Sequence, residues 1–191
     1  MKRSLMVATL VLLALGAAQA SNLLSNGDFE LPLDQGWSED VRMEAGDYSF
    51  DRWDTLGQPT PGYAARVYKY LARYASLYQV VDVPGVDLTF SFDGRFRIEG
   101  GSSTCWPTGA VILSYLDGTE AELGCTMVLL RNQYNDWVES DTMNFHDVEV
   151  PGEWEHYEFG VAEEIDNHLP GVNRADVAKV KVQLFSYTNG T

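Results

Sequence analysis

The chain is poor in the residues that most enzyme and metal sites require. It has two cysteines and three histidines in 191 residues, and His146, His156 and His168 are scattered without metal-ligand spacing. No serine lies in a nucleophile elbow, and no glycine-rich phosphate-binding loop is present. We therefore expect the three histidines to be ordinary surface or strand residues.

Positive charge is also scarce. The sequence has 13 lysines and arginines against 28 aspartates and glutamates, a net charge of −15. Such a charge keeps a protein soluble and argues against binding to nucleic acid or to an anionic membrane surface. It suits calcium or a neutral sugar better than an acidic polymer. With so many carboxylates, a pair at the separation that glycosidases use would arise by chance, so acidity alone does not indicate an enzyme.

The sequence has one long hydrophobic run, and it is at the start. Lys2 and Arg3 precede an apolar run over residues 5–18, which ends in an Ala-Gln-Ala cleavage pattern. This is typical of an export signal over residues 1–20, with a mature chain that begins at Ser21 and carries a net charge of −17. A run of about 14 residues is too short to span a bilayer, so we expect no membrane insertion. The alternative is a buried N-terminal helix.

The rest of the chain, residues 21–191, alternates between apolar and polar positions with a period of two. The clearest case is residues 86–100, where Val86, Leu88, Phe90, Phe92, Phe96 and Ile98 share one face. No long amphipathic helix and no internal repeat are present, and residues 163–178 are predicted as a loop with one helical turn at 174–177. About ten short strands predict one all-β domain, an antiparallel β-sandwich. Further strands are predicted over residues 63–70, 77–83, 109–116, 119–123, 144–150, 156–161 and 179–184.

Residues 22–30 read N-L-L-S-N-G-D-F-E, a short apolar strand that runs into a tight-turn signal at Asn26-Gly27-Asp28, and Gly36-Trp37 follows. This pattern resembles the opening of galactose-binding-like β-sandwich modules, which include many carbohydrate-binding modules of secreted bacterial glycosidases. The resemblance implies a jelly-roll fold and a secreted, periplasmic or cell-surface module. Such a module binds a polysaccharide or oligosaccharide without catalysis, often beside a catalytic domain in a longer parent protein.

The resemblance also implies one more strand after the turn at residues 187–190, where this sequence stops. Either the chain lacks its last strand, or a sheet edge is left open or filled from elsewhere. An exposed edge strand promotes aggregation, which favours the first interpretation.

A structural calcium ion near the first strand is a further implication of the resemblance. Glu30 matches a calcium-ligand position of the resembled modules, and Asp28 is a neighbouring carboxylate that matches less directly. Both residue types suit calcium, which binds hard oxygens from carboxylates and turn carbonyls. An aspartate of the final strand, which the resembled modules contribute, is absent from this sequence. The alternative is that Glu30 is simply solvated.

Cys105 and Cys125 are expected to form a disulfide, since the chain carries an export signal and no other thiol. A regular two-residue turn at Asp117-Gly118 would place Cys125 opposite Ala110. The bridge therefore requires residues 106–109 to fold back over the hairpin. The alternative is a pair of free thiols.

A sugar site needs flat aromatic rings that stack on the sugar and polar groups that bind its hydroxyls. Arg66 and Tyr68 share the polar face of one predicted strand, and Arg95 and Arg97 share that of another. The aromatic candidates are Trp53, Tyr115 and Trp137. An arginine on a wet strand face is often only solvated and a tryptophan often belongs to the core, so two other functions remain open. These are a structural or adhesive domain of the same fold and a small secreted polysaccharide hydrolase or lyase.

Overall fold

The computed structural model describes residues 22–42, 48–55, 59, 61–70 and 73–189, so the predicted export signal lies outside the described residues. Within them the chain forms ten strands, one α-helix and one short 3-10 helix. The strands are β1 (Ser38–Arg42), β2 (Tyr48–Asp54), β3 (Tyr63–Lys69), β4 (Tyr74–Asp82), β5 (Thr89–Arg95), β6 (Pro107–Leu116), β7 (Glu122–Arg131), β8 (Met143–Asp147), β9 (Trp154–Gly160) and β10 (Lys179–Thr188). The helices are α1 (Val161–His168) and η1 (Arg174–Asp176).

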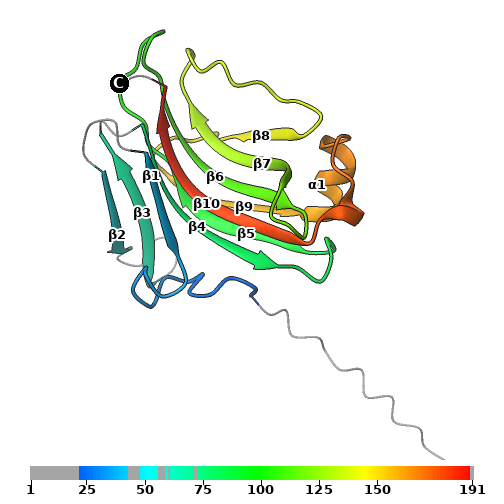
Figure 1. Cartoon of the computed structure of the whole chain (residues 1–191). Helices are drawn as coiled ribbons and strands as arrows, with labels where there is room; N and C mark the ends of the chain where they lie inside the picture. The colour runs from blue at the N-terminus through cyan, green and yellow to red at the C-terminus, as the bar shows by residue number, and fades with distance from the viewer. Residues whose placement is uncertain (1–21, 43–47, 56–58, 60, 71–72, 190–191) are drawn as a thin grey trace, which may run out of the picture.

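The strands are arranged in two layers (Figure 1). One layer is a six-stranded sheet in the order β1-β4-β10-β6-β7-β8, in which every pair is antiparallel except β7 and β8. Two separate pairs, β2–β3 and β5–β9, pack on its inner face. The prediction of an all-β antiparallel β-sandwich is confirmed.

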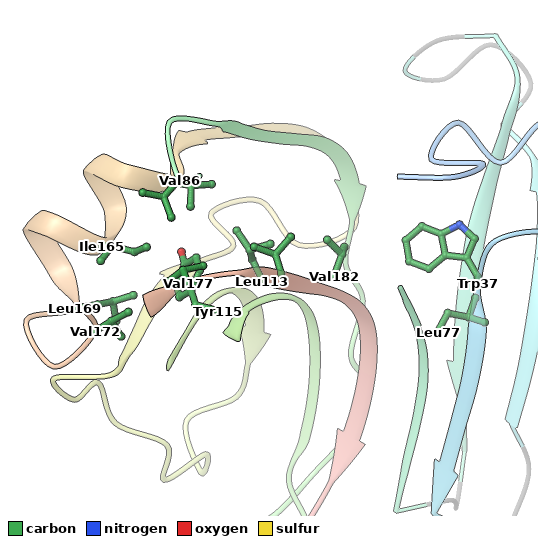
Figure 2. Packing of buried hydrophobic residues seen from close by; sticks show 12 residues of the cluster. Trp37, Leu77, Val86, Leu113, Tyr115, Ile165, Leu169, Val172, Val177 and Val182 are labelled. Carbon is green, nitrogen blue, oxygen red and sulfur yellow. The ribbon is translucent and has the colours of Figure 1, made fainter. Parts of the chain in front are cut away.

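The core lies between these layers and continues under α1 (Figure 2). β6 and β10 place Leu113, Tyr115 and Val182 on the inner face of the large sheet, and Ile165 and Leu169 of α1 close one end. All five side chains are at most 4% exposed. Burial of large apolar side chains such as these stabilises the fold by about 1.5–3 kcal/mol each.

The predicted alternation over residues 86–100 is confirmed. Its apolar residues are buried or half-buried, and the intervening residues are exposed apart from the buried Gly94. Phe96 packs edge-on against Tyr157 of β9, with ring centroids 5.9 Å apart and planes at 87°. The ladder itself is shorter than predicted, because β5 pairs with β9 only over Thr89–Arg95.

The prediction of a loop over residues 163–178 is wrong for residues 163–168, which belong to α1. Val161, Ile165 and Leu169 recur every four residues, which places them on one helical face against the core. Glu163 and Glu164 in the first turn suit the positive end of the helix dipole. The predicted turn at 174–177 matches η1. Among the described residues, no helix has the length and apolarity that a membrane span requires.

The opening stretch is a set of turns and not the strand that we expected. Asn26 and Phe29 have positive φ values of 50° and 57°, so the backbone reverses within residues 26–30. Two buried side chains hold it in place. Gln79 exchanges two hydrogen bonds with the backbone of Ser25 (2.9 and 2.6 Å), and the Trp37 indole N–H donates to the Asn26 carbonyl (3.1 Å).

The hairpin between β6 and β7 also differs from the prediction. Its loop is longer than two residues, because the Asp117 carboxylate accepts the N–H groups of Thr119 and Ala121. A register shift follows, so Cys125 lies opposite Ser114 and not Ala110. Both cysteines are free thiols, which contradicts the predicted disulfide. Cys105 precedes β6, and a strand rise of about 3.3 Å per residue puts roughly 20 Å between the two positions.

We expect Phe96→Ala to lower the free energy of unfolding by about 3–5 kcal/mol, because it removes a buried ring and leaves a cavity. Arg97→Ala is the matched control. Its side chain is 72% exposed and forms an ion pair with the exposed Glu99, so the change should stay within about 0.5 kcal/mol. Urea unfolding of both variants checks this, and similar losses would show that the register is wrong.

The thiols should differ in reactivity. Cys105 is exposed, and burial raises the pKa of the Cys125 thiol to about 12. We therefore expect iodoacetamide to label Cys105 in the native protein and Cys125 only after unfolding. Mass spectrometry of the non-reduced protein measures the labelling of each cysteine. If neither cysteine is labelled in the unfolded, non-reduced chain, the two are joined in a disulfide after all.

Candidate functional site

The predicted sugar-binding residues do not lie on one surface. Trp53, Arg66 and Tyr68 do lie together, on the outward side of the β2–β3 pair. Arg66 binds the Asp51 carboxylate at 2.7 Å, and its guanidinium carbon lies 5.8 Å from the centre of the Trp53 ring. Trp53 and Tyr68 are 45% and 50% exposed. Three of the seven candidate residues thus form one cluster.

Arg95 and Arg97 lie elsewhere. They line a hollow of about 500 Å³ beside Arg131 and Gly152, and no residue of the β2–β3 pair lines it. The two sets of candidates therefore do not meet on one sheet face, because β3 and β5 belong to separate strand pairs in the second layer.

Tyr115 cannot stack on a ligand, because its side chain is fully buried (Figure 2). Its hydroxyl shares a hydrogen bond of 2.8 Å with Thr126, and burial raises its pKa above the ordinary value. The prediction that Tyr115 is an aromatic residue of a sugar site is therefore wrong. All residues from Ala110 to Leu116 are buried, so both faces of this strand are covered.

An aromatic row crosses the outer face of the six-stranded sheet, on the side away from the core. It consists of Tyr74, Phe185, Tyr187 and Trp137, all half-buried. Successive ring centroids lie 5.8, 6.0 and 5.4 Å apart, and successive planes differ by 32°, 13° and 37°. The four partly exposed rings therefore form a continuous row on this face of the sheet.

Strand register creates this row. Tyr187 of β10 lies opposite Tyr74 of β4, and Phe185 lies between Ser76 and Ala110. Both neighbours of Phe185 are small, which leaves space above the sheet. The fourth ring comes from the connection between β7 and β8. Because these strands are parallel, the connection must run back along the sheet, as Figure 1 shows.

Polar groups border the aromatic row. The Tyr74 hydroxyl donates to the Asp40 carboxylate at 3.2 Å, and the Gln183 amide donates to the Ser76 hydroxyl at 3.2 Å. At the other end, Arg131 binds Asp147 through two hydrogen bonds of 2.9 and 3.0 Å and donates to the Trp137 carbonyl. Rings flanked by amide, carboxylate and guanidinium groups are the surface chemistry that sugars require.

Sequence reasoning found only one member of this row, Trp137. The predicted final strand stopped at Leu184, one residue before its two aromatic positions. The sequence does contain a signal for these two rings. The alternation of β10 continues past Leu184 and places Phe185 and Tyr187 on the same outward side as Gln183. The pairing that brings Tyr74 beside Tyr187 spans more than 100 residues and leaves no local trace.

At the opening turn, both predicted calcium ligands accept hydrogen bonds from the backbone. The Asp28 carboxylate accepts the backbone N–H of Glu30, whereas the Glu30 carboxylate faces β3 and accepts the N–H of Tyr63. The carbonyls of Phe29 and Glu30 are bonded to Arg52. Within the described ranges, no group of three or more His, Cys, Asp or Glu side chains is arranged to hold a metal ion.

A buried carboxylate joins α1 to the large sheet. Glu164 is 4% exposed, and its Oε1 accepts hydrogen bonds from Asn144 (2.6 Å), His146 (3.1 Å) and Thr126 (3.2 Å). Burial opposes ionisation of Glu164, but these bonds outweigh it and keep its pKa below the ordinary value. The hydrogen bond to Glu164 in turn raises the pKa of His146. Sequence reasoning treated this histidine as ordinary and missed Glu164 with its helix.

Comparison of the sequence with known families and curated proteins finds no relative. No protein-family model matches the chain, and no curated protein matches it in sequence.

Stability should depend on pH through His146 and Glu164. A histidine whose pKa is raised on folding stabilises the protein fully below about pH 6.5, and this contribution is lost as the pH rises through the folded-state pKa. A carboxyl whose pKa is lowered stabilises above about pH 4.5 and loses this effect on acidification. We expect the pair to stabilise most between these values.

Unfolding free energies of wild type and His146→Gln at pH 5.5 and 8.0 check this expectation. Wild type should lose more stability than His146→Gln on going to pH 8.0. His156→Gln is the control, because His156 is exposed and its contact with Asp93 is screened by solvent. Equal pH dependence in wild type and His146→Gln would contradict the assignment.

Proposed function

We propose that this protein is a secreted, non-catalytic carbohydrate-binding domain that holds a polysaccharide or oligosaccharide against the aromatic row. The observation that carries the proposal is the set of four half-buried rings on the outer face of the sheet, spaced 5.4–6.0 Å apart. The resemblance of residues 22–37 to galactose-binding-like modules and the export-signal pattern of residues 1–20 support it.

The row suits a chain of sugars better than a single small molecule. It is built on a rigid sheet and bordered by polar groups, and the neighbours of Phe185 are small. The proposal assigns no catalytic group. A neutral glycan also agrees with the net charge of −17 on the mature chain, since no counterion release is needed for binding.

Titration calorimetry against soluble xylan, β-glucan and mannan oligosaccharides tests the proposal. We expect dissociation constants in the micromolar to millimolar range, or about −4 to −8 kcal/mol, because solvated hydroxyls contribute little net energy. Trp137→Ala and Tyr74→Ala should each weaken binding by about tenfold or more, which corresponds to about 1.4 kcal/mol.

Tyr68→Ala and Trp53→Ala are the matched controls, since both are exposed aromatics on the β2–β3 pair. They should leave the affinity unchanged. If these two variants abolish binding while Trp137→Ala does not, the site belongs on the β2–β3 pair. If no glycan binds, the structural or adhesive function takes precedence.

A further inference from the structure

The opening turn presents several oxygen atoms to one cation. Phe29 adopts a left-handed backbone conformation (φ 57°), which is rare for a bulky residue. Asn26 fixes this reversal, because its side chain bonds both the N–H and the carbonyl of Leu31. The carbonyls of Phe29 and Glu30 meet at one guanidinium, that of Arg52.

Arg52 contacts the opening turn, the Glu30 carboxylate and the Tyr63 ring. Its Nε and Nη2 donate to the two carbonyls at 2.7 Å each, and Nη2 lies 3.9 Å from the Glu30 carboxylate. The guanidinium carbon lies 3.4 Å above the centre of the Tyr63 ring. Hydrogen bonds that a charged group donates are stronger than neutral ones, and a planar guanidinium fits two acceptors at once.

The Glu30 carboxylate completes this arrangement. Its Oε1 accepts the backbone N–H of Tyr63 at 3.3 Å, and its other oxygen faces Arg52. Gly62 makes this approach possible, because a Cβ at this position would lie only 2.6 Å from Oε1. Gly62 also has a φ of 139°, which side chains rarely adopt.

We propose that Arg52 is a built-in cation that occupies the position of a divalent metal ion in this turn. Two backbone carbonyls and a carboxylate are the ligands that calcium prefers, and in this chain a guanidinium fixed by its neighbours satisfies them. A divalent ion at the same oxygens would lie against a permanent positive charge. The turn is therefore stable without metal, and this conclusion does not depend on the proposed function.

Thermal unfolding of the purified protein in calcium and in EDTA tests the proposal. Wild type should have the same melting temperature in both, and calorimetry should detect no calcium binding up to about 5 mM, a concentration above the weak range of extracellular calcium sites. Arg52→Met removes the charge and the donors while keeping much of the side chain. It should melt at a lower temperature in EDTA and recover part of the loss in calcium, because a ligand that binds only the folded state stabilises it.

Arg66→Met is the matched control. Arg66 lies on the same strand pair but on its outward side, where it binds Asp51 and not the opening turn. This variant should not respond to calcium. Stoichiometric calcium binding by wild type would overturn the proposal, and so would an Arg52→Met protein whose melting temperature is the same in calcium and in EDTA.

If Arg52→Met does not fold, Arg52→Lys carries the test. It keeps one positive charge at the turn but lacks the planar pair of donors. We expect it to melt below wild type and to remain insensitive to calcium. A melting temperature equal to that of wild type, or a clear rise in calcium, would overturn the proposal.

Discussion

The pairing of β10 with β4 and β6 is the constraint on which the rest of the structure depends. β10 is the last strand in the chain and lies at the centre of the large sheet, and its pairing with β4 joins segments about 100 residues apart. Its inward residues Val180 and Val182 belong to the core, and its outward residues Phe185 and Tyr187 form half of the aromatic row. Because side chains alternate, a slip of one residue would move both sets to the wrong face.

This constraint explains why the two faces of the sheet differ in what they can do. The inner face is covered by the two strand pairs and α1, so its aromatic residue Tyr115 is buried and bonded to Thr126. The outer face is covered only in part, by the connection that carries Trp137. An aromatic ring on this face is supported from below by a rigid sheet and still meets solvent. Support by the sheet and access to solvent together make the outer face, and not the inner face, the better binding surface.

The sequence predicted the fold class well, because alternation is a local property that strand burial imposes. Residues 86–100 and the start of β10 followed their predicted faces. Errors arose where a hydrogen bond between a side chain and the backbone decided the local conformation. Gln79 and Trp37 hold the opening stretch as turns, and the Asp117 carboxylate lengthens a hairpin and moves Cys125 away from its expected neighbour. The candidate site was missed mainly because its rings come from three separate segments that meet only in the fold.

Arg52 and Arg66 lie on opposite sides of the β2–β3 pair, and they therefore have different partners. Their strands give Arg66 an outward position opposite Asp51, whereas Arg52 lies on the side of Phe50, which packs against the core. An exposed ion pair such as that of Arg66 with Asp51 contributes only about 0–1 kcal/mol. The donors of Arg52 that face the turn are already bonded to backbone carbonyls, so they are not free for a ligand. Composition alone cannot separate the two arginines, because the difference depends on what lies opposite each of them in space.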